Sequence, residues 1–356
     1  MSAYDNIAIH VQEATALDYR TYFDSTIIVP LETTEGAFIR EISKLYITED
    51  HILVFDSEGT KLLLFDREGH FIRQIGVQGE GPEEYRLFND VQFDRTMSVI
   101  YAHERFSNCI YTYDLSGHLI GKTPKASIFF NSFYKTDSGY WVYSCFPGKM
   151  GTGYNLTLLD HDLKTVKRTF FPQKKFVNAV FSSTFSESED GRAFFISPSS
   201  NIIHELVGDS VVPFVKADFG EKTIPYRFVT EIEDSKEYDN LIADRKYLGN
   251  ISNFKVNRRF CFFSFSETGY GIPLATYNCY YNYQAKQTCI YRNPYMESIN
   301  YPVSTTLLYA SNDVLVYALN LSVLTNNSYA DISKKLGTDL QFDSNPVLTF
   351  LHLKDF

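Results

Sequence analysis

A short apolar stretch that ends in an aromatic residue and an aspartate recurs along the chain, each time followed by a turn that ends in glycine. It reads ILVFDSEG at 52–59, LLLFDREG at 62–69 and IYTYDLSG at 110–117. The aspartate can cap a tight turn through its side chain, and glycine takes the positive φ that the reversal needs. Each copy therefore predicts a β-hairpin, and a further strand follows the second and third copies at 70–75 and 118–122.

Grouped by fours, the predicted strands form repeating units of the kind that build β-propellers. In the first unit the strands lie near 44–48, 52–56, 61–66 and 71–75. The units span 43–75, 90–122, 131–170, 182–217, 251–291 and 305–353. The sequence therefore predicts an all-β chain that forms a single six-bladed β-propeller domain over 1–356, with four-stranded antiparallel blades.

The last unit contains only three strands, at 305–310, 314–319 and 346–353. An open ring would leave unpaired strand edges exposed to solvent. The apolar stretch TIIVPLE at 26–32 can supply the missing outer strand. We therefore expect the N-terminal strand to pair with the C-terminal blade and to close the propeller.

Two segments interrupt the strand pattern. Residues 225–247 carry spaced apolar residues among dense charge, which favours an amphipathic helical connection between the fourth and fifth blades. Residues 329–336 have the pattern of a short helix inserted into the sixth blade. Long connections of this kind either cap one end of a propeller or take part in function.

The composition agrees with a folded β protein and argues against nucleic acid as a partner. Hydrophobic residues make up 44% of the chain and aromatic residues 16%, with 30 Phe and 26 Tyr. Aromatic side chains fit the pleated, half-buried surface of a sheet. The formal charge is −10, and no stripe of Lys and Arg is present that could neutralise a phosphate backbone.

No apolar run of about 18 residues is present, as a membrane-spanning helix would require. The first 20 residues also lack the basic start and the apolar middle of a secretion signal. The chain as given is therefore expected to be soluble, and its compartment is not predicted from this end. It is also expected to be a monomer.

The five cysteines form no CxxC pair, which argues against a zinc ribbon or a thioredoxin motif. Most of them are expected to be small buried hydrophobic residues. Cys261, Cys279 and Cys289 fall in the fifth unit, where neighbouring strands could bring two of them together. A disulfide there stays an alternative, because spacing does not determine alignment across strands.

The segment GVQGEGPEEY at 76–85 closes the first unit and strongly resembles a motif of a family of NHL-like six-bladed propeller proteins from anaerobic gut bacteria. Members typically have a strand, FD with a following glycine, a strand that ends in IG, and then GxGxGPxEY. Residues 52–85 follow that order, and NPVLTFLHLK at 345–354 resembles the family's closing strand. One departure is Glu83-Glu84, where the family often has a glycine before Glu-Tyr.

The resemblance covers essentially the whole chain, although it is specific only at the two ends. It implies export, commonly as a lipoprotein of the cell envelope, and a role in binding. It implies no catalytic activity.

The glycine-rich loop at 76–81 invites comparison with a phosphate-binding loop. A P-loop continues with Lys and Ser or Thr and leads into a helix, and this sequence has neither. The loop is therefore interpreted as a crossover between blades that Pro82 makes rigid.

An enzymatic alternative comes from the six-bladed propellers that act as calcium-dependent lactonases or esterases. Calcium there would need hard oxygen ligands from the innermost strands of several blades. Residues of this type near the starts of predicted innermost strands are Glu41, Asp90, Asn131, Asn178 and Asn253. Their spacing is irregular, and Asn and Asp are also ordinary turn residues.

Two further groups of residues are candidates for binding. His103, Glu104 and Arg105 follow a predicted second strand and could form part of a channel rim, or a solvated loop. The run YNCYYNY at 277–283 could stack on sugar rings or peptide side chains, although alternation in a strand favours packing between blades. No G-x-S-x-G motif for a nucleophilic serine is present.

Together these patterns favour a non-enzymatic binding or scaffold protein of the cell envelope, in the periplasm or at the cell surface, over the calcium-dependent hydrolase. A propeller face would hold a peptide, a glycan or a partner protein. The predicted binding residues at a channel mouth are Asp90, Asn131, Asn253, His103 and Arg105. No metal site or cofactor is predicted, and only the hydrolase alternative would require calcium.

Overall fold

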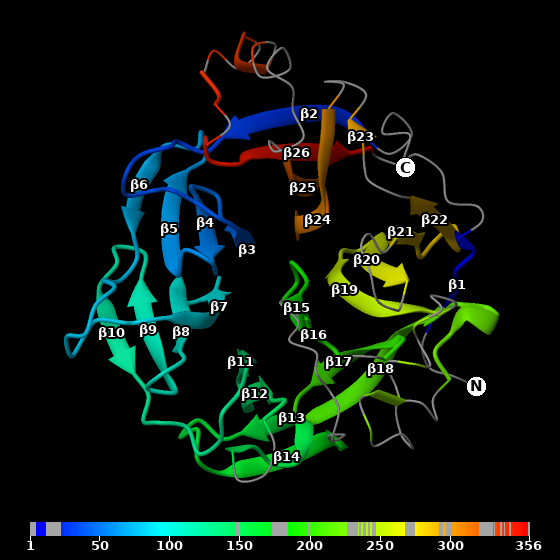
Figure 1. Ribbon diagram of the computed structural model, residues 1–356, viewed down its shortest axis with the longest axis horizontal. Coiled ribbons are helices and arrows are strands. Elements are labelled where there is room, and N and C mark those ends of the chain that lie inside the picture. Colours follow the sequence, from blue (N-terminus) through cyan, green and yellow to red (C-terminus); the bar gives the residue numbers. More distant parts are fainter. Residues whose placement is uncertain are drawn as a thin grey trace. The chain divides into compact units, whose positions relative to one another are not determined.

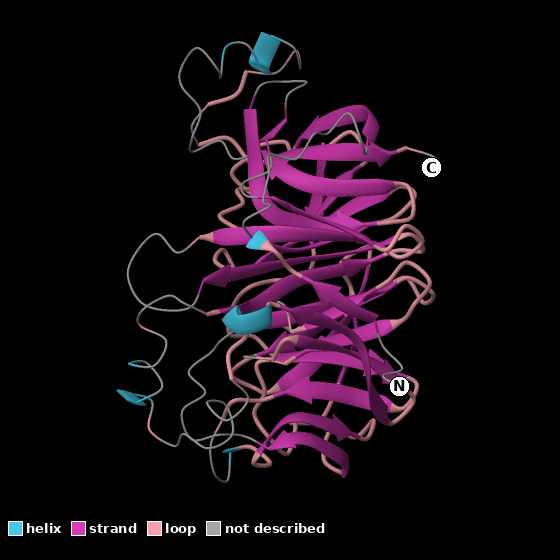
Figure 2. Ribbon diagram, turned by 90° about the vertical axis from the view of Figure 1, so that its right-hand side faces the viewer, coloured by secondary structure: helices cyan, strands magenta, loops and turns pink. Residues whose placement is uncertain are grey.

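The computed structural model is an all-β protein in which strands make up nearly all of the regular structure (Figure 2). It describes residues 5–11, 23–146, 150–172, 184–197, 200–225, 247–267, 275–291, 295–296, 301–319 and 343–354, together with isolated positions between 234 and 243 and between 330 and 341. Six sheets carry the strands, and the fold is a six-bladed β-propeller of four-stranded antiparallel blades, as predicted.

Contacts divide the chain into two compact units, which are described in turn. The single-domain assignment stays a prediction. Residues 18–125 and 294–356 form one unit, called here the closure unit because it contains both closing strands. Residues 1–17 and 126–293 form the other, called the central unit.

The closure unit contains the first, second and sixth blades. The first has β3 (Ile42–Ile47), β4 (His51–Asp56), β5 (Lys61–Asp66) and β6 (Phe71–Gln74). The second has β7 (Phe88–Asp94), β8 (Val99–Glu104), β9 (Cys109–Asp114) and β10 (Leu119–Lys122). The sixth has β2 (Phe23–Pro30), β23 (Tyr295–Met296), β24 (Tyr301–Ala310), β25 (Val314–Leu319) and β26 (Val347–Leu353).

The predicted closure is confirmed. Strand β2 pairs antiparallel with β26, and the register places Thr26 opposite Leu351 and Pro30 opposite Val347. These strands come from opposite ends of the chain and lie side by side (Figure 1). After β2 the chain crosses to the first blade, where the Glu32 amide donates to the Gly69 carbonyl over 2.8 Å. Gly69 has φ +92°, and a Cβ there would lie 2.2 Å from the Pro30 carbonyl oxygen, so the closing strand requires glycine at this position.

The central unit contains the third, fourth and fifth blades. The third has β11 (Ser132–Thr136), β12 (Gly139–Tyr143), β13 (Tyr154–Leu159) and β14 (Val166–Pro172). The fourth has β15 (Phe185–Glu187), β16 (Ala193–Ile196), β17 (Ile202–Val207) and β18 (Ser210–Asp218), and the 3-10 turn η3 (Gly220–Lys222) follows it. The fifth has β19 (Leu248–Val256), β20 (Phe260–Glu267), β21 (Thr276–Asn282) and β22 (Gln287–Tyr291).

The fourth blade also holds a strand that the sequence pattern did not indicate. Strand β1 (Asp5–Ala8) pairs parallel with β18, on the outer edge of the sheet. Its Ile7 is 1% exposed and joins the core shared by the fourth and fifth blades. Lys286 fastens the start of the strand through an ion pair with Asp5, 3.0 Å between Nζ and Oδ2. The N-terminal segment is thus part of the central unit's core.

The cores lie between neighbouring blades, where alternate side chains of facing strands meet. In the fifth blade this explains the aromatic run, because Tyr277 and Tyr281 pack in the core against the fourth blade. Both lie beside Cys279, which shares that core. All five cysteines are free thiols, so the disulfide alternative does not hold. The reason is alignment, because Cys279 pairs across the strands with Phe263 and Ile290, not with another cysteine.

Most of the predicted helical connection at 225–247 lies outside the described residues, and within it the described residues Lys236, Glu237 and Asn240 have helical backbone. At the predicted helix of 329–336, the described residues Ala330, Ile332, Ser333 and Lys334 have helical backbone, and the others lie outside. Ile332 is 2% exposed, so this insertion places an apolar side chain against the protein.

Candidate functional site

The turn between β8 and β9 rests on a buried histidine. His103 is 1% exposed, and its Nε2 lies 3.1 Å from Oδ1 of Asn108, which has φ 54°. Because an amide oxygen only accepts, Nε2 carries the proton in this bond. Burial lowers the pKa of His103 to about 4. The neutral side chain therefore holds Asn108 in the left-handed conformation that the turn requires.

A buried carboxylate fastens the same turn. Oε2 of Glu104 accepts a hydrogen bond from the Ser107 amide over 2.5 Å, and Oε1 accepts one from the Leu87 amide over 3.4 Å. Burial alone would raise the pKa of Glu104, but the hydrogen bonds from Ser107 and neighbouring amides outweigh it and hold that pKa below its usual range. The Arg105 amide also donates to the Leu87 carbonyl over 3.0 Å. The turn is therefore tied to the segment that precedes β7.

That segment, the connection 76–87 between the first two blades, uses its glycine amides internally. The Gly79 amide donates to the Tyr85 carbonyl over 2.9 Å, and the Gly81 amide donates to Oε2 of Glu84 over 2.8 Å. A Cβ on Gly79 would lie only 2.0 Å from the same oxygen. The Glu84 carboxylate thus occupies the place that an anion would take, and the geometry agrees with a crossover rather than a phosphate site.

The connection presents an arginine against an exposed aromatic ring. Nε2 of Gln78 donates to the Arg86 carbonyl over 3.1 Å and to Oγ1 of Thr60 over 2.8 Å, which fixes the Arg86 backbone. The Arg86 guanidinium carbon lies 4.4 Å from the centre of the Phe106 ring. Phe106 is nevertheless 54% exposed. Arg86, Arg105 and Phe106 are called here the basic–aromatic cluster.

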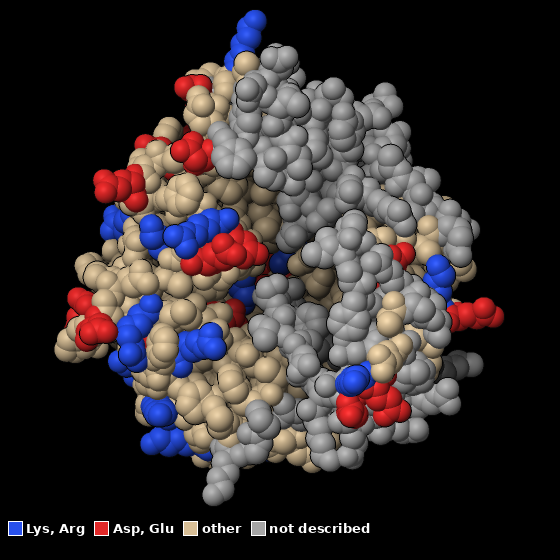
Figure 3. All heavy atoms as spheres, viewed as in Figure 1, with Lys and Arg blue, Asp and Glu red and all other residues tan. Residues whose placement is uncertain are grey.

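The two arginines of this cluster lack ion-pair partners in the part of the chain that the structure describes. Among the residues that the structure describes, neither Arg86 nor Arg105 forms an ion pair, and both are exposed. Two exposed carboxylates, Glu80 and Glu83, are nearby. They lie in the tip of the loop between Gln78 and Tyr85, whose backbones form an isolated β-bridge. On the face seen in Figure 3, Lys and Arg side chains lie over the first two blades with Asp and Glu side chains among them.

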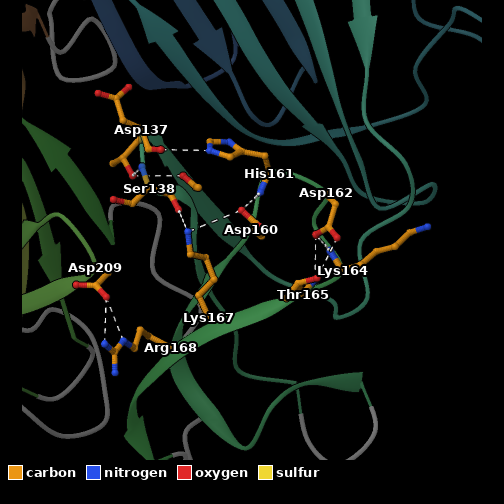
Figure 4. Close-up of polar contacts among 12 residues, drawn as sticks. Asp137, Ser138, Asp160, His161, Asp162, Lys164, Thr165, Lys167, Arg168 and Asp209 are labelled. Carbon is orange, nitrogen blue, oxygen red and sulfur yellow. Dashed lines mark hydrogen bonds and ion pairs between the residues drawn. The ribbon is translucent and has the colours of Figure 1, made fainter.

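Two exposed cations of the central unit form ion pairs. In the third blade, Nζ of Lys167 lies 3.8 Å from Oδ1 of Asp160. The guanidinium of Arg168 lies 3.2 Å from Oδ2 of Asp209 in the fourth blade. Figure 4 shows both pairs, and there the Lys164 ammonium points away from its neighbours. The basic–aromatic cluster differs because it combines two unpaired guanidinium groups with an exposed ring.

Of the predicted binding residues in the closure unit, only Arg105 is exposed. Asp90 is 4% exposed and forms an ion pair with Lys44 of β3, 2.6 Å between Oδ1 and Nζ. The same ammonium donates to the Val91 carbonyl over 2.8 Å. Asp90 and His103 are direct partners in the β7–β8 register, but both side chains serve internal contacts.

The two predicted residues of the central unit also make contacts within their own blades. Oδ1 of Asn131 accepts from the Cys145 amide over 3.2 Å and lies 3.1 Å from its Sγ. Asn253 has φ 53° in an irregular part of β19, and its Nδ2 lies 3.4 Å from Oγ of Ser264. Asn178 lies outside the described residues.

Sequence reasoning missed Arg86 and Phe106, although a comparison of repeats carries the signal. The turn of the first blade reads Ser57-Glu58-Gly59-Thr60, and the equivalent turn of the second reads Arg105-Phe106-Ser107-Asn108. A large aromatic residue at an exposed turn position is unusual in a hairpin, where polar residues dominate. That substitution between repeats was the available indication of a surface with a role beyond folding.

No group of three or more potential metal ligands occurs among the described residues. In that part of the chain there is also no helix both long and apolar enough to cross a membrane.

Residues 5–352 match the model of one protein family, described as a domain of unknown function, DUF4934. A solved structure from Bacteroides fragilis, named "Putative exported protein", is similar with a TM-score of 0.76 at 15% identity, covering 99% of this chain and 100% of that one. A member of the duf4221 family from Bacteroides vulgatus is similar with a TM-score of 0.58 at 12% identity, covering 93% and 97% of the two chains. No curated protein sequence matches the chain. These likenesses support the fold.

Proposed function

Since the chain belongs to the DUF4934 family, we propose that it is a non-enzymatic binding or scaffold protein of the bacterial cell envelope. The observation that carries this proposal is the basic–aromatic cluster. An exposed aromatic ring beside arginine side chains that form no ion pair in the described part of the chain combines the residue types that are enriched at binding surfaces.

The cluster is prepared for binding by the structure beneath it. Buried His103 and Glu104 hold the turn that carries Arg105 and Phe106, and Gln78 holds the backbone of Arg86. A ligand therefore meets side chains whose backbones are already ordered, which lowers the entropy cost of association. Arginine and aromatic residues are also the types that contribute most to affinity at protein interfaces.

The proposed location of the protein is the cell envelope. The similar structure from Bacteroides fragilis carries the name of an exported protein, and the resemblance of the sequence motifs points to exported lipoproteins. We place the protein in the envelope, at the periplasmic side or the cell surface, where it would meet peptides, glycans or other proteins. A lipid anchor would hold it at the membrane.

A thermal-shift survey with separate panels of peptides, glycans and metal ions tests the proposal. We expect an organic ligand to raise the melting temperature in the absence of any metal, because a ligand that binds only the folded state stabilises it. A large stabilisation by calcium together with hydrolysis of an ester or a lactone would contradict the proposal and favour the enzymatic alternative.

A further inference from the structure

We propose that the basic–aromatic cluster of Arg86, Arg105 and Phe106 binds an acidic polypeptide segment that also carries apolar side chains. This inference rests on the proposed binding function and names the class of partner and the place where it docks. It is carried by the exposure of the cluster, by the contact between Arg86 and Phe106, and by the two guanidinium groups that form no ion pair within the described part of the chain.

Charge complementarity indicates that the partner is negatively charged where it contacts the cluster. The chain as a whole has a formal charge of −10, so an acidic partner is repelled by most of its surface. The two arginines form a local exception, since no ion pair within the described part of the chain neutralises them. A guanidinium presents a planar set of donors that matches a carboxylate in two-point contact.

The stacking on Phe106 makes Arg86 the better of the two anchors. With the ring 4.4 Å below its guanidinium carbon, one face of the Arg86 side chain is covered, while Phe106 itself stays 54% exposed. The edge of the guanidinium can then donate to a carboxylate, and the rest of the ring can contact an apolar side chain. Val77, which is 62% exposed on the same connection, adds apolar surface.

A peptide fits this surface better than an acidic glycan does. Sugar hydroxyls require both donors and acceptors, and the two polar side chains that hold the backbone of the cluster, Gln78 and Glu104, are already used. The Gln78 amide bonds to Thr60 and to the Arg86 carbonyl, and the Glu104 carboxylate bonds to Ser107 and Leu87. What the cluster offers is guanidinium donors and apolar surface, and acidic peptides with apolar residues require these two features.

The test measures binding of a fluorescent glutamate–tyrosine copolymer to the full chain, with poly-L-glutamate and polygalacturonate as competitors. The test variants are Arg86→Glu with Arg105→Glu, and Phe106→Ala. The matched control is Lys164→Glu with Lys222→Glu, which changes the charge by the same amount at two exposed lysines of the central unit. We expect the double arginine variant to weaken binding about tenfold or more and Phe106→Ala about fivefold, with less than about a twofold change in the control.

Each other outcome decides against the inference. Equal losses in the arginine variant and the control would mean that only net charge matters. Polygalacturonate that binds through the cluster more tightly than the copolymer would replace the polypeptide with an acidic glycan. If no acidic polymer binds while a neutral peptide or glycan still stabilises the chain, this inference fails and the proposed binding function stands. Melting temperatures of all variants, expected to be within a few degrees of the parent, separate lost binding from lost folding.

Discussion

At the scale of single residues, one asparagine joins the two ends of the chain. Asn345 is fully buried, and its Oδ1 accepts from the Ile39 amide over 2.8 Å. Its Nδ2 donates to the carbonyls of Glu32 and Ala37 over 2.7 and 2.6 Å. The side chain thus uses its acceptor and both donors to hold the segment that leads from β2 into the first blade.

Replacement of Asn345 by alanine should therefore be costly. It leaves one buried amide and two carbonyls without their partner, and we expect a loss of about 3 kcal/mol in the free energy of unfolding. Urea denaturation followed by circular dichroism measures it. Asn201→Ala is the control, because Asn201 is half-buried and its side chain makes one hydrogen bond within the described residues, to the Ala217 carbonyl at 3.0 Å. Equal losses in the two variants would contradict this role of Asn345.

A second residue-scale prediction concerns acid stability. His204 is 8% exposed, lies 4.9 Å from the Phe171 ring between centroids, and burial lowers its pKa to about 4. In the unfolded chain histidine has a pKa near 6.5, so the unfolded state binds more protons between these values. The contribution of neutral His204 to the free energy of unfolding is therefore complete above about pH 6.5, and it is lost as the pH falls toward 4.

His204→Phe should remove part of this loss, because phenylalanine binds no proton. The measurement is the melting temperature at intervals from pH 7.5 to 4, and we expect a shallower decline in the variant than in the parent. His161→Gln, at an exposed hairpin position, is the control and should keep the parent's decline. An unchanged slope in His204→Phe would show that the acid loss arises elsewhere.

At the scale of elements, the closing strand β2 offers a matched pair of substitutions. Val29 is 8% exposed in the core shared with the first blade, whereas Ile27, two residues earlier in the same strand, is 53% exposed. Val29→Asp buries a charge and should lower the free energy of unfolding by about 3 kcal/mol, and Ile27→Asp should change it by less than about 0.5 kcal/mol. Denaturant titration of both proteins is the measurement. Similar effects in the two variants would mean that β2 contributes little to the fold.

A comparison of strands shows which of them local sequence patterns are sufficient to predict. The hairpins at 52–69 and 110–117 were predictable because alternation of apolar residues and the turn residues are encoded locally. Strand β1 was not, because its four residues pair with β18 more than 200 positions away and carry too few apolar side chains to mark a strand. It pairs with β18 because the outer edge of that sheet offers unpaired backbone groups, and the local sequence of β1 contains no information about that edge.

At the scale of the whole molecule, all five cysteines are free, so no covalent link joins distant parts of the chain. We expect mass spectrometry after alkylation in denaturant without reductant to find five modified thiols, and dithiothreitol to leave the melting temperature unchanged. In the native protein Cys261 should react slowly, since burial raises its pKa to about 12 and leaves almost no thiolate. Fewer than five thiols would contradict the structure.

The sequence by itself determined the blade repeat and the closure by Thr26 to Pro30, because strand alternation and turn residues act over a few positions and every open edge needs a partner. It did not determine the functional surface. Asp90 looked available from its position at the start of a strand, yet Lys44, 46 residues earlier, neutralises it. Arg86 and Phe106, 20 residues apart, meet only because two connections fold against each other. Which polar and aromatic groups stay free depends on contacts between distant segments, and only the tertiary structure decides those.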